Sequence, residues 1–196
     1  MVLAIRITDD LARLDKVLHR HERELMTKAV PQAINKTVTT VASRAVKHVS
    51  AITSEKQKDI RAKMVLKKAS PKHLSASVDM REARATNLIK FVSTSQRNAG
   101  TFRRRTKKGF KHPGVKAKAW GSSKYYRGTF IGTGKDSGAQ LVFKRGSSGK
   151  AQSVTGPSAR REFIKPDSTA MLRRVTKQRI RIELSAAINN MIRRQV

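Results

Sequence analysis

The sequence predicts an α+β protein in which a mostly antiparallel sheet packs against a long N-terminal helix and a C-terminal helix, with a long basic loop. Three patterns lead to this prediction. Apolar residues recur at helical spacing in residues 30–52, they alternate with polar residues from Leu74 onward, and helical spacing returns after Pro166. Spacings near 3.6 residues indicate helices, and a two-residue alternation indicates strands.

The length of the chain, 196 residues, fits one domain with a hydrophobic core. We therefore expect a single domain over residues 1–196. Its expected parts are a helical N-terminal part (residues 1–64), a sheet region (residues 65–158) that includes the basic loop (residues 97–127), and a C-terminal helix (residues 165–195).

Two helices are expected near the N-terminus. Thr8, Asp9 and Asp10 are typical of a helix start, because acidic side chains favour the positive end of the helix dipole. The second and longer helix, about residues 29–51, has one apolar stripe that needs a partner to cover it. The stripe consists of Val30, Ile34, Val38, Val41, Ala45, Val49 and Ile52.

A short helix and then strands are expected to follow. Ser54 and Gln57 have the spacing of a capping box, which predicts a helix over residues 55–64 and an extended segment after it. Glycine and serine clusters separate the later strands, and crossover helices have no room between them, so the sheet should be mostly antiparallel. The expected strands are residues 74–80, 88–92, 115–120, 125–131 and 140–144.

The C-terminal helix should begin at Pro166 and could reach Arg194. It has two nearly opposite apolar stripes, and such a helix usually lies between two partners. The second partner is either another subunit or the rest of the same fold, and the sequence leaves both open. One stripe is Met171, Val175, Ile182 and Ala186; the other, which we predict as the subunit interface, is Ile180, Leu184, Ile188 and Met191.

The charge of the chain is strongly positive. The formal net charge is +31 and the pI is about 11.6, which favours nucleic acid, another polyanion, or acidic neighbours in an assembly. The sequence has no cysteine, so it offers no disulfide framework and no thiolate metal site. No apolar run approaches the ~20 residues of a membrane span, and the N-terminus does not resemble a signal peptide. We expect a cytoplasmic protein without membrane contact.

The most basic stretch lies between Asn98 and Gly128, and no acidic residue occurs between Glu82 and Asp136. Glycines and a proline make this stretch a loop rather than a helix. Cations on such a loop attract phosphate backbones without reading sequence; the alternatives are a solvated loop and one neutralised by acidic protein. The predicted nucleic-acid-binding residues are Arg103, Arg104, Arg105, Lys107, Lys108, Lys111, Lys116 and Lys118.

Aromatic residues are interleaved with these cations. Trp120, Tyr125 and Tyr126 could stack on bases, but packing of all three against the sheet is the expectation that we prefer.

The sequence gives no sign of catalysis. His19 and His21 are two residues apart, so on a helix they diverge and cannot share a metal ion. Gly134-Lys135 lacks the flanking residues of a phosphate loop. We predict no catalytic residue, no metal, no cofactor and no enzymatic activity.

Two motifs point to a family. Ala33-Ile34-Asn35-Lys36 opens the long helix, and Lys58-Asp59-Ile60-Arg61 leads into a basic extended segment. With later echoes at LIKFVS, LVFKRGSSGK and Gly156-Pro157-Ser158, residues 30–158 resemble the prophage minor tail protein Z family, the tail completion proteins of long-tailed bacteriophages. The chain differs from that family in its exceptionally basic loop at residues 103–118.

The resemblance implies a structural virion protein at the head-proximal end of the tail, present in the host cytoplasm during assembly. It implies tail completion and head–tail joining by a ring subunit around the DNA path. It also implies a homo-oligomer, a hexameric ring, that contacts neighbouring tail and neck proteins. The alternative is a sequence-nonspecific nucleic-acid-binding protein of ribosomal or nucleoid type, which composition alone would favour. The punctuated sheet and the lack of a recognised nucleic-acid module speak against it.

Overall fold

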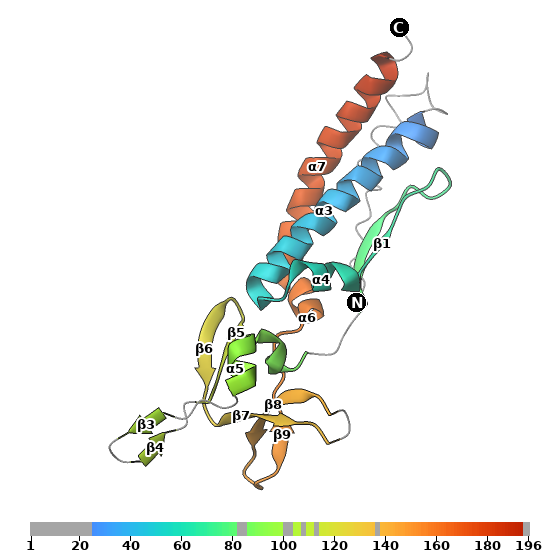
Figure 1. Ribbon diagram of the computed structural model, residues 1–196. Coiled ribbons are helices and arrows are strands. Elements are labelled where there is room, and N and C mark those ends of the chain that lie inside the picture. The colour runs from blue at the N-terminus through green and yellow to red at the C-terminus, as the bar shows by residue number, and fades with distance from the viewer. Residues whose placement is uncertain are drawn as a thin grey trace. The chain divides into compact units, whose positions relative to one another are not determined.

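The computed structural model describes residues 25–81, 86–99, 104–106, 109–111, 114–135 and 138–193. The described elements confirm the α+β class (Figure 1). The chain forms two compact units, each assembled from distant segments: a helical unit of residues 1–48, 58–82 and 163–196, and a sheet unit of residues 49–57 and 83–162. Whether both fold as a single domain stays a prediction. The helix expected from Thr8 lies outside the described residues.

The long helix α3 spans Val30–Thr53, as its apolar stripe predicted. It directly follows a π-helical turn η1, Leu25–Ala29, and Pro31 is its second residue. Val30, Ile34, Val41 and Val49 are at most 2% exposed. The sequence pattern therefore identified both the helix and its buried face.

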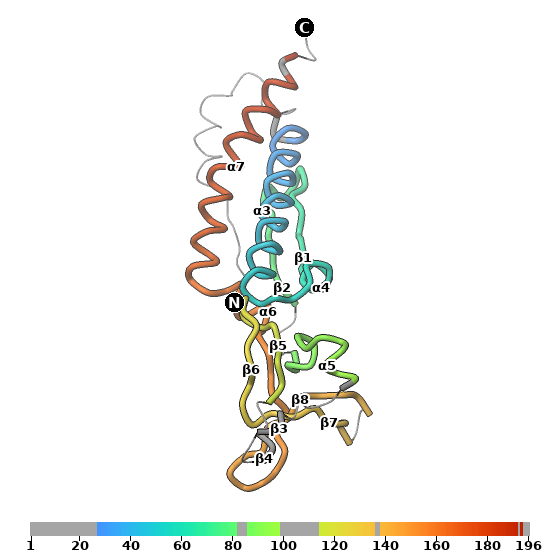
Figure 2. Tube along the Cα trace, turned by 60° about the vertical axis from the view of Figure 1, so that its left-hand side comes forward, coloured from blue at the N-terminus to red at the C-terminus, as the bar shows by residue number. Residues whose placement is uncertain are grey.

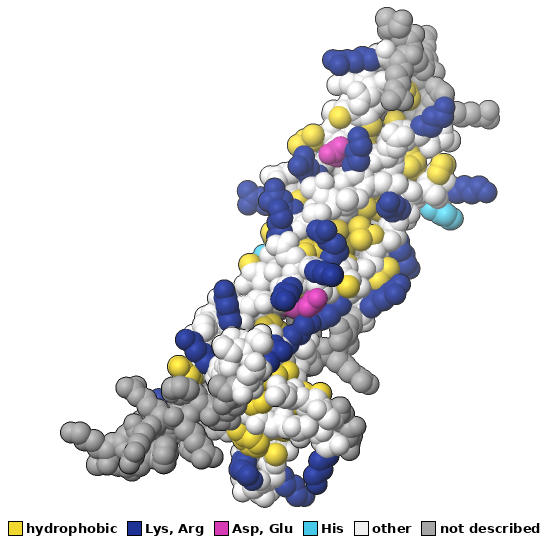
Figure 3. All heavy atoms as spheres, viewed as in Figure 1, with side chains coloured by type: hydrophobic (Ala, Val, Ile, Leu, Met, Phe, Trp, Pro, Cys, Tyr) yellow, Lys and Arg dark blue, Asp and Glu magenta, His cyan; other side chains and the backbone are white. Residues whose placement is uncertain are grey.

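The helical unit also contains a hairpin and the C-terminal helix. Strand β1 (Met64–Lys67) follows the short helix α4 (Gln57–Lys63) and pairs antiparallel with β2 (Ser77–Met80). Helix α7 spans Pro166–Arg193, as predicted. Both views show α3 between α7, which runs antiparallel to it, and the β1–β2 hairpin (Figures 1 and 2). The face of this unit that is seen in Figure 3 carries many lysines and arginines and few acids.

The capping-box prediction at Ser54 was wrong. Ser54 has φ 61° and ends α3, because its N–H bonds to the Ser50 carbonyl at 2.8 Å. A left-handed residue just past a helix satisfies one of the last carbonyls, which is the role of a C-terminal cap. The hydroxyl of Ser54 accepts a hydrogen bond from the Gly121 N–H at 3.0 Å, so it does not open α4.

In its described residues the sheet unit contains three small antiparallel sheets rather than one continuous sheet. The first two are hairpins and the third has the order β7-β8-β9. The strands are β3 (Arg104–Thr106), β4 (Gly109–Lys111), β5 (Val115–Ala119), β6 (Ser122–Tyr126), β7 (Thr129–Thr133), β8 (Gln140–Arg145) and β9 (Ala151–Ser153). The helices are η2 (Leu88–Phe91), α5 (Thr94–Ala99) and α6 (Ala159–Phe163), whose last residue begins the helical unit.

Two strand predictions in this unit were wrong. Within residues 88–92, Leu88–Phe91 form the 3₁₀ turn η2, because the Asn87 side chain caps the Ile89 N–H at 2.9 Å. Residues 125–131 are not one strand, because a turn with Gly128 at φ 72° separates β6 from β7. Short apolar runs do not distinguish strand from helix, and the turn fell inside the predicted run.

The core of the sheet unit lies between η2, the β5–β6 hairpin and the third sheet. Asn87 joins two of these parts, since its amide group bonds to the Val142 N–H at 3.0 Å and to the Val142 carbonyl at 3.3 Å. The buried members of the core are Leu88, Phe91, Val92, Val115, Ala117, Ala119 and Val142. This core fixes the hairpin that carries two of the predicted binding residues.

Candidate nucleic-acid interface

The basic stretch predicted as a loop contains the β3–β4 hairpin. Arg104 pairs in register with Lys111, and Arg105 pairs with Phe110. Like charges at directly opposed positions disfavour strand pairing. Of the predicted binding residues in this stretch, the two strands contain Arg104, Arg105 and Lys111. Three others, Arg103, Lys107 and Lys108, lie outside the described residues.

The β5–β6 hairpin presents Lys116 and Lys118 to solvent. The strand alternates, with Val115, Ala117 and Ala119 in the core and both lysines exposed. Lys116 lies against Tyr125, with its Nζ atom 5.7 Å from the ring centroid. The alternation of small apolar residues and lysines thus fixes the direction of these two cations.

Two backbone contacts hold the start of this hairpin. The Val115 N–H donates to the Thr129 hydroxyl at 3.0 Å, and that hydroxyl donates to the Tyr126 carbonyl. Gly114, with φ 90°, lies so close that a Cβ atom would stand 1.9 Å from the Tyr126 oxygen. Only glycine can therefore join the basic stretch to β5 along this path.

Helix α5 supports the position of Lys116. The Gln96 amide lies against the Lys116 backbone, and in the orientation that satisfies both groups it donates to the carbonyl at 2.7 Å and accepts from the N–H at 2.9 Å. A side-chain amide here occupies the place of a neighbouring strand. It thus provides hydrogen-bond partners for the backbone N–H and carbonyl of Lys116 at the edge of β5.

The sheet unit has almost no acidic surface. Residues 83–162 contain nineteen lysines and arginines but only two acids, Asp136 and Glu162. Glu162 is 6% exposed, and Glu55, the remaining acid of the unit, is 3% exposed and pairs with Lys90 at 3.0 Å. Both acids that the structure describes in this unit are therefore withdrawn from the surface.

Trp120 and Tyr125 do not pack on the sheet, which corrects the preferred expectation. Trp120 is 42% exposed and Tyr125 is 49% exposed. Tyr126 does pack against the core, as expected, and burial raises its pKa above the ordinary value for tyrosine. The sequence indicated aromatic side chains near the cations. Only the folded β5–β6 hairpin shows which of these side chains face solvent.

The predicted subunit-interface residues lie on α7. Ile180 and Leu184 are 2% and 5% exposed within this chain, while Ile188 and Met191 are half-buried. The first two side chains thus already serve the fold of the single chain. Ile182, from the opposite stripe, is 55% exposed. The interface on Ile180, Leu184, Ile188 and Met191 stays a prediction.

Asn35 is an important residue whose role the sequence did not reveal. Its Nδ2 donates to the Ala69 carbonyl at 3.0 Å, and its Oδ1 accepts from the Ala69 N–H at 2.8 Å. The side chain therefore fixes the segment after β1 to the second turn of α3. Its place in the motif Ala33–Lys36 was the available signal, but the partner is 34 residues away.

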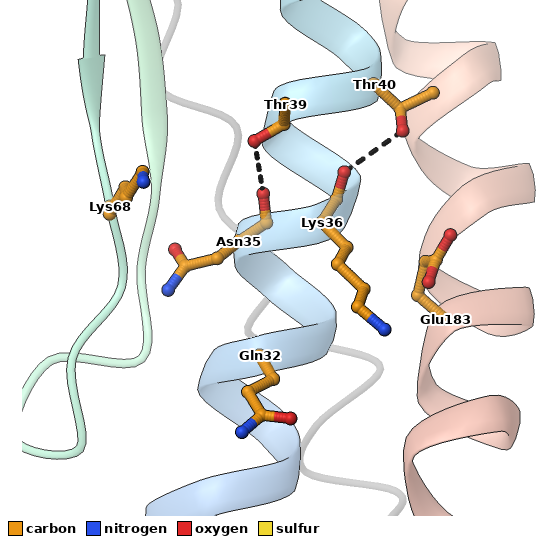
Figure 4. A pocket seen from close by; sticks show the side chains of 7 residues that line it. All are labelled: Gln32, Asn35, Lys36, Thr39, Thr40, Lys68 and Glu183. Carbon is orange, nitrogen blue, oxygen red and sulfur yellow. Dashed lines mark hydrogen bonds between the residues drawn. The ribbon is translucent and has the colours of Figure 1, made fainter.

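Beside Asn35 the surface of α3 has an open depression of about 530 Å³. Gln32 and Lys36 project from α3 there, with Lys68 of the hairpin segment on one side and Glu183 of α7 on the other (Figure 4). The charged residues that line the depression are two lysines and one glutamate, so it is less basic than the surface of the sheet unit. None of the described residues forms a cluster of three or more histidines or acids that could hold a metal ion.

Comparison with known families identifies the chain. The family model of the prophage minor tail protein Z (GPZ) matches residues 13–196. The chain belongs to this family and is a structural protein of a phage tail, with its place in the virion tail and other tail proteins as its neighbours. No curated protein and no solved structure matches it. Across the described residues, no helix combines the length and apolarity needed to cross a bilayer.

Proposed function

We propose that this tail protein acts in tail completion and head–tail joining, as the subunit of a ring around the DNA path at the head-proximal end. The observation that carries the proposal is the charge of the sheet unit, with nineteen cations and two acids in residues 83–162. A structural protein gains nothing in stability from such an excess, because like charges repel in the folded state. The excess is useful where a polyanion passes.

The binding chemistry follows from the arrangement of the two basic hairpins. Lysine and arginine contacts to phosphates release counterions and carry no base information. The β3–β4 ribbon sets Arg104 opposite Lys111, and phosphates beside the ribbon would offset that repulsion. Lys116 and Lys118 extend the same chemistry along the exposed face of β5.

A ring would place one copy of this surface on every subunit around the DNA. The resemblance to tail completion proteins supports a sixfold ring, and α7 supplies apolar side chains for contact between copies. Membership in a tail protein family favours this role over a free ribosomal or nucleoid-type protein. The particle mass of the purified chain and of assembled tails tests the stoichiometry.

The DNA-path proposal is tested by removing charge from the basic stretch. The variant changes Arg103, Arg104, Arg105, Lys107 and Lys108 to glutamine, and its control makes the same change at five exposed cations of the helical unit, Lys36, Arg44, Lys47, Arg173 and Arg174. On duplex DNA, the slope of log affinity against log salt should fall by up to about 0.9 for each phosphate that the variant no longer neutralises. The slope of the control should fall less.

Infectivity provides the second measurement. Tails that contain the variant should assemble but join heads or deliver DNA poorly, while the control variant should do both well. Unchanged duplex affinity together with full infectivity would show that the basic stretch is a solvated excursion, and the DNA-path proposal would then be wrong.

A further inference from the structure

The tip of the β5–β6 hairpin is an unusual place for a tryptophan. Ala119 pairs with Ser122, so the turn consists of Trp120 and Gly121 alone, with φ 52° and 74°. Two-residue turns with positive φ at both positions prefer Asn-Gly, because a bulky L-residue is strained there. Strain of this kind, when observed, points to a function for the residue that bears it.

The strained turn is fixed to the end of α3. The Gly121 N–H donates to the Ser54 hydroxyl at 3.0 Å, and Ser54 is itself left-handed with φ 61°. A Cβ atom on Gly121 would stand 3.3 Å from the Ala51 carbonyl oxygen. Ser54 and Trp120 are the two non-glycine residues with positive φ among those described, and the hydrogen bond joins Ser54 to the residue that follows Trp120.

The indole ring of Trp120 lies near Tyr126 and Lys124 and is partly exposed. Its centroid lies 6.2 Å from that of Tyr126, which packs on the core. The Lys124 ammonium lies 5.8 Å from the Trp120 centroid and 5.3 Å from the Tyr126 centroid. Since Trp120 remains 42% exposed, the hairpin presents a rigid aromatic ring with a cation beside it.

We propose that Trp120 and Lys124 form the anchor of a docking surface for an acidic protein partner, with an apolar pocket for the indole and a carboxylate for the ammonium. The proposal rests on the proposed function only in placing that partner in the tail or neck. Tryptophan and tyrosine dominate binding energy at protein interfaces, because they bring large apolar area with few rotatable bonds. A rigidly presented ring also loses little entropy on binding.

Charge excludes a second copy paired through the same surface. The acids of the sheet unit that the structure describes, Glu55 and Glu162, are buried, so two such surfaces would oppose cation to cation. Like charges across an interface disfavour association and suppress wrong partners. A partner of complementary charge is therefore required.

Nucleic acid is the weaker candidate for this tip. A duplex exposes no base faces, so it would use the cations of the surface and leave the indole without a partner. A single strand needs successive rings to stack on, whereas Trp120 and Tyr126 are tilted by 40° and Tyr125 lies on the other face of the hairpin. The rings therefore do not form a continuous platform.

The decisive variant is Trp120→Asn, because asparagine suits the turn while it removes the ring. A phage that carries this chain, with its own gene disrupted, is complemented with the wild type or with a variant, and the chain is quantified in purified tails. We expect Trp120→Asn to lower incorporation at least tenfold. The melting temperature should stay equal or rise, and affinity for a 30-bp duplex should change less than twofold.

Two further variants keep the test independent of the turn. Lys124→Ser should lower incorporation several-fold, and Lys124→Glu should lower it further, since it sets a carboxylate against an acidic partner. Tyr125→Thr is the matched control, an equally exposed aromatic on the opposite face, and should change incorporation less than twofold.

The proposal is wrong if Trp120→Asn or both Lys124 variants enter tails at the wild-type level. If Trp120→Asn enters tails normally and also binds (dT)20 tenfold more weakly, the ring serves a single strand instead of a protein. Failure of the DNA-path proposal appears elsewhere, as unchanged duplex affinity together with full infectivity of the glutamine variant of the basic stretch. The two results are therefore separable.

Discussion

The helical unit and the sheet unit reach a folded state by different means. The helical unit buries the long stripe of α3, in which Val30, Ile34 and Val41 are at most 2% exposed. The sheet unit has short strands and small core residues such as Ala117 and Ala119, and it relies on turns and side-chain bonds to backbone. One unit depends on buried area and the other on backbone geometry.

Their charges differ in the same sense. The helical unit contains twenty-four basic and ten acidic residues, and the sheet unit contains twenty and three. The unit with the smaller apolar core thus carries the less compensated charge. Since net charge destabilises a compact state, the sheet unit should gain more stability than the helical unit from added salt or a bound polyanion.

The largest predicted effect tests the role of buried area. Val41 is 1% exposed in the middle of the α3 stripe, so Val41→Asp would place an unpaired charge in the core. We expect a loss of about 3–5 kcal/mol in the free energy of unfolding, a large part of the roughly 5–15 kcal/mol that stabilises a typical domain. Circular dichroism at 222 nm measures it.

The exposed Lys47 of the same helix provides the control for that change, because Lys47→Asp should cost less than about 1 kcal/mol. Trp120 is the one tryptophan of the chain and belongs to the sheet unit, so its fluorescence follows that unit separately. Coincident transitions by both probes would support the single-domain prediction. A soluble Val41→Asp variant with the wild-type melting temperature would contradict the burial of the α3 stripe.

The two units also differ in how well their secondary structure could be predicted from the sequence. Helices α3 and α7 are long enough for their periodicity to be unambiguous, and both were predicted nearly to the residue. The sheet unit was harder, because a run such as residues 88–92 satisfies the pattern of a strand and of a buried turn. Strand β9, with the sequence AQS, has a single alanine as its apolar residue and therefore no alternating pattern.

In the candidate site, too, a local sequence pattern predicted some residues, while long-range contacts placed others. Alternation with small apolar residues was enough to expect Lys116 and Lys118 on a strand. The exposure of Trp120 was not predictable, because it depends on a two-residue turn and on a hydrogen bond to Ser54, 67 residues away. Long-range contacts of this kind, like that of Asn35 with Ala69, leave no local pattern in the sequence.

The intermediate effect tests backbone geometry in the sheet unit. Gly114→Ala would combine a left-handed φ of 90° with a Cβ atom 1.9 Å from the Tyr126 oxygen. We expect a loss of roughly 2–3 kcal/mol, measured by the melting transition of Trp120 fluorescence. Gly149→Ala is the matched control, because it has φ 73° and open space around it, so it should cost only about 1 kcal/mol. Equal losses in the two variants would show that the close approach at Gly114 does not matter.

The smallest effect concerns a buried hydroxyl in the same unit. The Tyr126 Oη is buried and has no hydrogen-bond partner among the described residues, and burial raises the pKa of this phenol. Removing an unpartnered hydroxyl is nearly neutral, so Tyr126→Phe should change the free energy of unfolding at pH 7 by less than about 0.5 kcal/mol.

The effect of Tyr126 should appear at high pH instead. The folded chain keeps the phenol protonated above the pH at which the unfolded chain releases the proton, near pH 10. The unfolded state then binds fewer protons than the folded state, so this contribution to stability is complete below about pH 10 and falls as the pH rises through the raised pKa. Melting temperatures between about pH 9 and 11 should decline less steeply in Tyr126→Phe than in the wild type. Tyr125→Phe, which changes an exposed phenol, should leave the decline as it is in the wild type. Parallel curves for all three proteins would show that the Tyr126 phenol is as accessible to water as that of Tyr125.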